Sequence, residues 1–313
     1  MRTLPLTRVP AVAAAAAALL AASGCRADAD GKHGDEPAAA VSGTQCVVLN
    51  KDVTLPEDLK ESSGLAESRV RPGVYWTHND SGHGSDIFAV TPGGQLVDRV
   101  TVLGATNRDW EDIASGRCPE GTGNCLYLAD TGDNGRGGGK HTLRLAVVDE
   151  PPAGATTATA REYAGHLPGK RTDIEAMALL PDGRVYLVTK GIDEDIELYR
   201  WPTPLVIGAE AALERARRLA PRAEALGDRV TGASASPDGR WVAVRTYAAL
   251  AFYRTADLLG SGGPVSQFDL SPLGESQGEA VSLANDGTVL LTSEGTGRHL
   301  PGTIARLRCT LPR

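Results

Sequence analysis

Residues 175–190 read EAMALLPDGRVYLVTK, which is two apolar segments of strand length on either side of the pair Asp182-Gly183. Asp-Gly between two apolar runs is a strong signal for a β-hairpin. The same pair recurs at 238–239 and 286–287, again between apolar runs. The hairpin is therefore one unit of a repeat, and the repeat decides the fold class.

Aligning the chain with itself gives five segments, separated by 48, 64, 56 and 48 residues: SGLAES from Ser63, EDIASG from Glu111, EAMALL from Glu175, TGASAS from Thr231 and EAVSLA from Glu279. A second apolar strand follows each segment, and a third is usually readable. Repeats of this length with about four strands are typical of β-propeller blades. We predict an all-β propeller of five blades, with six blades as the alternative if the 64-residue interval holds an irregular one.

The last repeat has only 35 residues, enough for three strands. The segment QCVVLNKDVTLP at 45–56 can supply the missing outer strand, so the N- and C-terminal strands would close the ring. That closure places Cys46 and Cys309 on neighbouring strands. Within the third repeat, GAEAALERARRL at 208–219 is interpreted as a short helix on the third blade.

The N-terminal residues are typical of export. Residues 1–24 contain Arg2, Arg8 and an apolar run from 9 to 22, and Cys25 follows Ala22-Ser23-Gly24. This pattern predicts a lipoprotein signal peptide with lipidation at Cys25, and plain secretion is the alternative. The polar residues 25–44 are expected to be a flexible tether, and residues 45–313 the propeller domain. The protein is then extracytoplasmic and anchored to the cell membrane by lipid.

Four further cysteines, Cys46, Cys118, Cys125 and Cys309, form an even set in an oxidising compartment. Cys118 and Cys125 flank a turn and can form a local bridge, which leaves Cys46 and Cys309 as the second pair. Zinc is the competing interpretation, but the chain has no CxxC and its histidines lie elsewhere. The sequence favours two disulfides.

The composition and several failed motifs exclude other functions. A net charge of −7 and an aromatic content of 4% argue against a nucleic-acid partner. GRGGGK at 135–140 lacks the first Gly and the final Ser or Thr of a phosphate-binding loop, and GASAS at 232–236 does not match a nucleophile elbow. No catalytic residue is assigned.

The candidate site follows from propeller geometry, because an inner strand begins at the mouth of the channel where the second strand ends. The segments THNDSG (77–82) and ADTGDN (129–134) are such second-strand ends. Seven residues are expected at this mouth as oxygen ligands for calcium: Asn79, Asp80, Glu111, Asp130, Asp133, Glu175 and Glu279. The alternative is that Asp, Asn and Gly only form turns here.

Four more residues are expected at the same mouth as ligand-binding groups: His78, Lys190, Arg245 and Glu294. Lys190 and Arg245 can neutralise the acids as ion pairs, or they can hold an anionic substrate such as a phosphate or a carboxylate. A metal ion facing basic side chains would suit phosphoester hydrolysis.

A resemblance supports the fold. ESSGLAES, the strand ending in N-D-x-G, IFAVTPGGQLV and DWEDIA resemble the secreted bacterial propellers grouped with phytase-like esterases and SdiA-regulated proteins, over residues 61–134. The resemblance implies a propeller, usually described as six-bladed, and does not by itself imply an activity.

We therefore expect a cell-surface lipoprotein that binds a small molecule or a protein partner at one propeller face, with calcium. The alternative is a metal-dependent hydrolase, a phosphoesterase, esterase or lactonase, at the same face.

Overall fold

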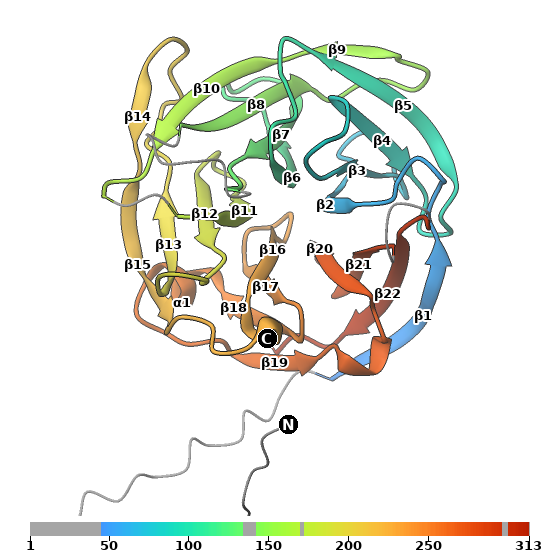
Figure 1. Ribbon diagram of the computed structural model, residues 1–313, viewed down its shortest axis with the longest axis vertical. Coiled ribbons are helices and arrows are strands. Elements are labelled where there is room, and N and C mark those ends of the chain that lie inside the picture. The colour runs from blue at the N-terminus through green and yellow to red at the C-terminus, as the bar shows by residue number, and fades with distance from the viewer. Residues whose placement is uncertain (1–44, 134–141, 170–171, 296–299, 313) are drawn as a thin grey trace, which may run out of the picture. The chain divides into compact units, whose positions relative to one another are not determined.

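The computed structural model describes residues 45–133, 142–169, 172–295 and 300–312. The strands of this part of the chain form five sheets around a central axis (Figure 1). This confirms the predicted five-bladed propeller. The predicted signal peptide, the tether and Cys25 lie outside the described residues. In the described part of the chain, no helix is long and apolar enough to cross a membrane.

Each blade is a sheet whose innermost strand is the first of its repeat. Blade 1 contains β2 (Ser62–Glu67), β3 (Tyr75–Asn79), β4 (Asp86–Val90) and β5 (Leu96–Leu103), and blade 2 contains β6 (Trp110–Arg117), β7 (Asn124–Asp130), β8 (Leu143–Asp149) and β10 (Arg161–His166). Blade 3 contains β11 (Ile174–Leu179), β12 (Val185–Thr189), β13 (Ile196–Arg200) and β15 (Glu214–Ala220). Blade 4 contains β16 (Val230–Ala235), β17 (Trp241–Thr246), β18 (Ala249–Arg254) and β19 (Ser266–Asp269). Blade 5 contains β20 (Gln277–Leu283), β21 (Thr288–Glu294), β22 (Thr303–Cys309) and, from the N-terminal side, β1 (Cys46–Thr54).

Among the described residues, the longer repeat intervals hold extra strands and no sixth blade. β9 (Thr157–Thr159) pairs in parallel with β5 of blade 1, and β14 (Glu210–Ala212) pairs in parallel with β10 of blade 2. Each extra strand extends the sheet of the preceding blade, so it links neighbouring blades at the periphery. The 64- and 56-residue intervals are long because they contain these strands.

The prediction of a helix at 208–219 is wrong, because this segment forms β14 and β15. β15 pairs with β13, and β14 pairs with β10, so both form hydrogen bonds with the edge strands of existing sheets. Between them Leu213 is buried against blade 2 and blade 3. Strand pairing and burial outweigh the helix propensity of the Ala, Glu and Arg residues here. The described helices are short and lie elsewhere: α1 (Thr255–Leu259) and the 3-10 turns η1 (Leu226–Asp228) and η2 (Ser271–Leu273).

Hydrophobic packing between blades holds the ring together. Each pair of neighbouring blades encloses its own cluster of buried apolar side chains. Trp76 and Trp110, both fully buried, belong to the cluster between blades 1 and 2. Alternate residues of each strand face opposite neighbours, so both faces of a blade are buried. This explains why the inner and second strands are almost continuously apolar.

Both predicted disulfides are present. Cys46 and Cys309 face each other across β1 and β22 and are bonded, which closes the ring over a sequence separation of 263 residues. Cys118 and Cys125 are bonded within blade 2, over a separation of 7 residues. Disulfides of this kind are typical of proteins in an oxidising, extracytoplasmic compartment.

A buried carboxylate joins the inner strands of three blades. The side chain of Asp112 on β6 is fully buried, and its Oδ1 accepts a hydrogen bond from the N–H of Ile113 at 2.8 Å. Its Oδ2 accepts hydrogen bonds from Met177 N–H on β11 at 2.7 Å and from Ala233 N–H on β16 at 3.2 Å. Blades 2 and 4 are not neighbours, so this one side chain joins the inner strands of three consecutive blades.

We predict that the two disulfides contribute unequally to stability. By the chain-entropy estimate, the loop closed by Cys46 and Cys309 corresponds to about 5.5 kcal/mol and the short loop of Cys118 and Cys125 to about 2 to 3 kcal/mol. Urea unfolding of the two double Cys→Ser variants measures the difference. Equal losses would contradict the assignment of ring closure to the terminal bridge.

We also predict that Asp112→Asn lowers the free energy of unfolding by about 2 to 4 kcal/mol, because the amide NH2 would replace one carboxylate oxygen and leave the backbone N–H groups that it faces without an acceptor. Urea unfolding is the measurement. Asp182→Asn, in the exposed hairpin of blade 3, is the control and should change stability by no more than about 0.5 kcal/mol. A neutral Asp112→Asn would show that these hydrogen bonds do not hold the inner strands.

Candidate functional site

Every inner strand interrupts its regular pairing at the same repeat position. The breaks lie between Ser62 and Leu65, Trp110 and Asp112, Ile174 and Ala176, Val230 and Gly232, and Gly278 and Val281. The residues inside these breaks include Ser63, Glu111, Glu175, Thr231 and Glu279, the positions that begin the sequence repeats. A β-bulge turns a side chain away from the alternation of the strand, and bulges are frequent next to functional sites.

In four blades, a backbone hydrogen bond brings the residue after the second strand back to the start of the inner strand. Asp80 N–H donates to Glu61 O at 2.8 Å, and Lys190 N–H donates to Asp173 O at 2.9 Å. The equivalent bonds join Thr131 to Asp109 and Tyr247 to Arg229, both at 3.2 Å. Asp80, Thr131, Lys190 and Tyr247 are therefore equivalent positions of four blades at one mouth of the channel.

Two overlapping groups of three carboxylates gather at this mouth. Asp80, Asp109 and Glu111 form the first group, and Glu111, Asp173 and Glu175 form the second. In each group, one oxygen from every residue lies within 4.8 Å of the others, which is compatible with a single metal ion. Asp109, Glu111 and Glu175 are each no more than 4% exposed.

Gly132 packs directly against the first group. A Cβ at this position would overlap the Glu111 carboxylate and would lie 2.7 Å from Oδ2 of Asp109. The Gly132 N–H also donates to Asp109 O at 3.2 Å. The glycine thus permits a close approach of the backbone to the carboxylates, and any side chain there would displace them.

Lys190 is the basic side chain that pairs with the second group. Its Nζ lies 2.5 Å from Oε1 of Glu175 and 3.6 Å from Oδ2 of Asp173. Burial lowers the pKa of Lys190, but Glu175 and Asp173 outweigh that effect and raise it above its ordinary value. The ammonium therefore stays charged.

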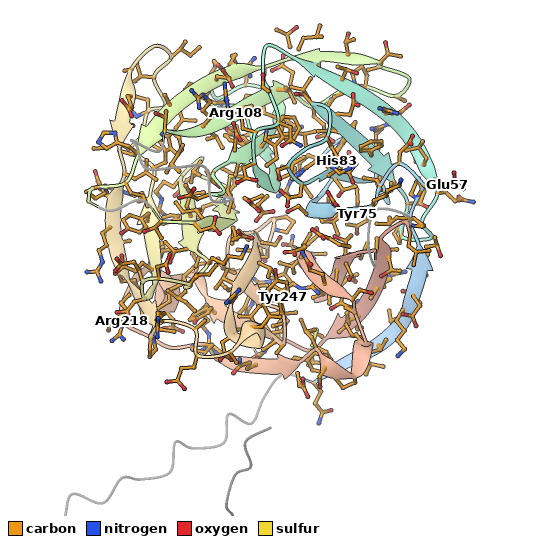
Figure 2. All side chains as sticks on the ribbon, viewed as in Figure 1. Glu57, Tyr75, His83, Arg108, Arg218 and Tyr247 are labelled. Atoms are coloured by element: carbon orange, nitrogen blue, oxygen red, sulfur yellow. A yellow bond between two sulfur atoms is a disulfide. The ribbon has the colours of Figure 1, made fainter. Side chains whose placement is uncertain are left out.

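The blade 5 side of the mouth is also acidic. Glu279 accepts hydrogen bonds from Gln277 Nε2 at 2.8 Å and from the hydroxyl of Tyr247, labelled in Figure 2, at 3.3 Å. Glu294 ends β21, and Glu279 and Asp80 are among the acids that raise its pKa. Each of these residues comes from an inner-strand start or a second-strand end.

Burial is the largest cause of the shifted pKa values. It raises the pKa of Glu111 and Glu175 well above the ordinary value, and neighbouring carboxylates add to the effect. It also raises the pKa of Asp80 to about 6, of Glu279 to about 7 and of Glu294 to about 9. Packed carboxylates favour either protons or a compensating positive charge.

The other predicted site residues make contacts within the fold. Asn79 accepts a hydrogen bond from Glu61 N–H and donates one to Asp58 O. Asp130 accepts from Asp109 N–H and pairs with Arg108, and the N–H of Asp133 donates to Asp173 Oδ1.

His78 and Arg245 are fully buried. The Nδ1 of His78 lies 3.0 Å from Asn79 O, its ring meets Trp110 edge to face, and burial lowers its pKa to about 4. Arg245 donates to Ala280 O and Thr292 O and pairs with Glu275, so it links blade 4 to blade 5.

The structure adds two acids that the sequence reasoning missed, Asp109 and Asp173. Both stand two residues before a glutamate of the repeat, in D-W-E at 109–111 and D-I-E at 173–175. Gln277-Gly278-Glu279 has the same spacing. The repeated D-x-E pattern could have identified them.

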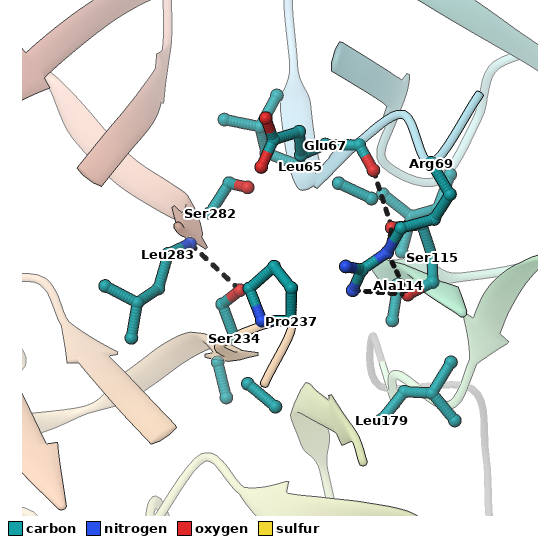
Figure 3. A pocket seen from close by; sticks show the side chains of 14 residues that line it. Leu65, Glu67, Arg69, Ala114, Ser115, Leu179, Ser234, Pro237, Ser282 and Leu283 are labelled. Carbon is teal, nitrogen blue, oxygen red and sulfur yellow. Dashed lines mark hydrogen bonds between the residues drawn. The ribbon is translucent and has the colours of Figure 1, made fainter. Parts of the chain in front are cut away.

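The opposite end of the channel has a different character. A small pocket there is lined by all five inner strands, mainly with small and apolar residues (Figure 3). Arg69 crosses from blade 1 to blade 2 and donates to Ser115 O and Oγ. Glu67 is the carboxylate among the lining residues. The groups of three carboxylates therefore belong to one mouth only.

Comparisons with known proteins show the fold. No protein-family profile matches the sequence, and no curated protein matches it. The PQQ-bound aldose sugar dehydrogenase of Streptomyces coelicolor matches with a TM-score of 0.54 and 12% identity, over 87% of this chain and 100% of that chain. The β-propeller domain of Myceliophteria thermophila Cps50 (Swd1) matches with a TM-score of 0.41 and 11% identity, over 85% of this chain and 100% of that one.

We predict that the metal-free protein loses stability as the pH rises from about 5 to about 9. The folded state holds protons on Asp80, Glu279 and Glu294 that the unfolded chain has already released, so this stability is present at low pH and is lost through the raised pKa values. Urea unfolding in chelator across this range measures the slope. Glu279→Gln and Glu294→Gln should each flatten it, and an unchanged slope in both would contradict the raised pKa values.

Proposed function

We propose that this mouth binds a divalent cation, calcium first, and that the protein uses the same face to bind a ligand or a partner. One observation carries the proposal: five carboxylates, Asp80, Asp109, Glu111, Asp173 and Glu175, form two overlapping groups, and Lys190 is paired with only one of them. Calcium prefers carboxylate and carbonyl oxygens in flexible geometry.

Three features support a metal ion over simple turn formation. The carboxylates come from different blades and converge, whereas a turn needs only its own residues. Glu111 and Glu175 are buried, and burial of a charge is costly unless it is compensated. Gly132 lies where a side chain would push Glu111 and Asp109 apart. The PQQ of the sugar dehydrogenase is not part of the proposal, because that likeness concerns the fold alone.

The proposal includes the cell surface as the place of action. Two disulfides agree with an extracytoplasmic protein. The sequence pattern around Cys25 supports a lipid anchor, and the polar residues after it would hold the propeller away from the membrane. The resemblance of residues 61–134 to secreted phytase-like and SdiA-regulated propellers supports the same location.

A metal-dependent phosphoesterase, esterase or lactonase is the second candidate. It is favoured by a pocket beside the second carboxylate group, lined by Asp133, Thr172, Asp173, Ile192 and Asp193. A metal ion at the mouth would act as a Lewis acid toward a substrate oxygen. Turnover of generic phosphoester, ester and lactone substrates with calcium or manganese, abolished by chelator, would select this candidate.

We predict that calcium raises the melting temperature of the wild type. At a concentration 100-fold above its dissociation constant, an ion that binds only the folded state adds about 2.7 kcal/mol. Glu111→Gln removes the carboxylate that both groups share and should abolish the effect. Gly132→Ala keeps every carboxylate but displaces two of them, so it should also abolish it. Melting curves with calcium and with chelator are the measurement.

Gly263→Ala is the matched control, because a Cβ there meets no atom within 4 Å. It should melt like the wild type and keep the full calcium effect. A calcium-independent and manganese-independent midpoint in the wild type would overturn the proposal and leave ion pairing as the role of these acids.

A further inference from the structure

We infer that the ammonium of Lys190 takes the place of a second metal ion, so that the mouth binds one divalent cation and not two. The inference rests on the proposed metal function and specifies it. The first carboxylate group, Asp80, Asp109 and Glu111, is then the metal site, and the second group is filled by a cation of the chain itself.

The arrangement of the two groups carries the inference. Both groups include Glu111, so if each group held a cation, the two cations would be neighbours, one on either side of the Glu111 carboxylate. Two metal ions bridged by a shared carboxylate are a common arrangement in hydrolytic sites. Here the Nζ of Lys190 already lies 2.5 Å from Glu175 and 3.6 Å from Asp173, which are the two acids special to the second group.

The backbone of Lys190 holds this amine in place. Its N–H donates to Asp173 O at 2.9 Å, and its carbonyl accepts from Val230 N–H at 3.1 Å, so blades 3 and 4 both fix it. The side chain is only 17% exposed. Lys190 is therefore part of the wall of the mouth, unlike a flexible surface lysine that contacts an acid only transiently.

Among the four equivalent positions of the repeat, the one in blade 3 holds a lysine and the other three do not. The equivalent positions of blades 1, 2 and 4 hold Asp80, Thr131 and Tyr247. Blade 1 contributes a carboxylate where blade 3 contributes an ammonium. The mouth is thus divided into a side that gains an oxygen ligand and a side that gains a positive charge.

The physical chemistry of an ammonium favours this role. It is a compact point charge that satisfies carboxylate oxygens much as a small cation does. A divalent ion in the second group would have to displace it, and the buried ammonium would then lie beside two divalent ions. With Lys190 in place, the second group has little need of a metal.

The test is the number of metal ions bound. Isothermal titration with calcium and with manganese should give one equivalent for the wild type. Lys190→Gln removes the charge and should give two equivalents. Adding Asp173→Asn and Glu175→Gln to Lys190→Gln should bring the number back to one, because only the first group remains.

Two variants serve as controls. Lys190→Arg keeps the positive charge and should bind one equivalent. Lys51→Gln removes a lysine charge on blade 5, where its amine bonds to Pro272 O, and should also bind one. Together they separate the charge at the mouth from the net charge of the protein.

Each result decides between the two proposals. A wild type that binds no metal contradicts the metal function itself. Two equivalents in the wild type, or one in Lys190→Gln, would overturn the role of Lys190 and leave the metal function standing. If Lys190→Gln is unfolded in chelator, metal should restore its folding with two equivalents, and failure to fold at any metal concentration would also overturn the inference.

Discussion

The carboxylate of Asp112 is the interaction on which the rest of the propeller depends. It joins the inner strands of blades 2, 3 and 4 through backbone N–H groups. Glu111 and Glu175 lie on two of the strands that it joins, and burial is the largest cause of their raised pKa values.

Most of the fold could be predicted because the sequence pattern repeats once per blade. The Asp-Gly hairpins, the five repeat starts and the pairing of Cys46 with Cys309 all depend on local patterns or on simple counting along the chain. The extra strands β9 and β14 could not be predicted so directly. They are three residues each, and they are strands only because β5 and β10 offer them an edge. A helix at 208–219 was the wrong inference for the same reason.

The candidate site was only partly predictable. Glu111 and Glu175 begin sequence repeats. The β-bulges at these positions direct their side chains toward the mouth, where Asp80 and Lys190 also lie. Asn79 and Arg245 also stand near the ends of second strands, but the amide of Asn79 bonds to backbone groups, and the guanidinium of Arg245 donates to backbone carbonyls of blade 5. Which polar group faces the mouth and which faces the backbone depends on the side-chain direction at each strand end. That direction is set by pairing partners far away in the sequence.

The charge pattern of the mouth connects stability with function. Buried carboxylates oppose folding when no cation is present, and the interblade cores and the closing disulfide must outweigh that cost. Lys190 removes part of the cost permanently, on the side of Glu175. On the side of Asp80 no such amine comes from the equivalent position of the repeat, because that position is itself an acid. In the proposed metal site, the remaining cost is the free energy that a bound cation would recover, so the acids that weaken the cation-free propeller are the ones we propose to bind the ion.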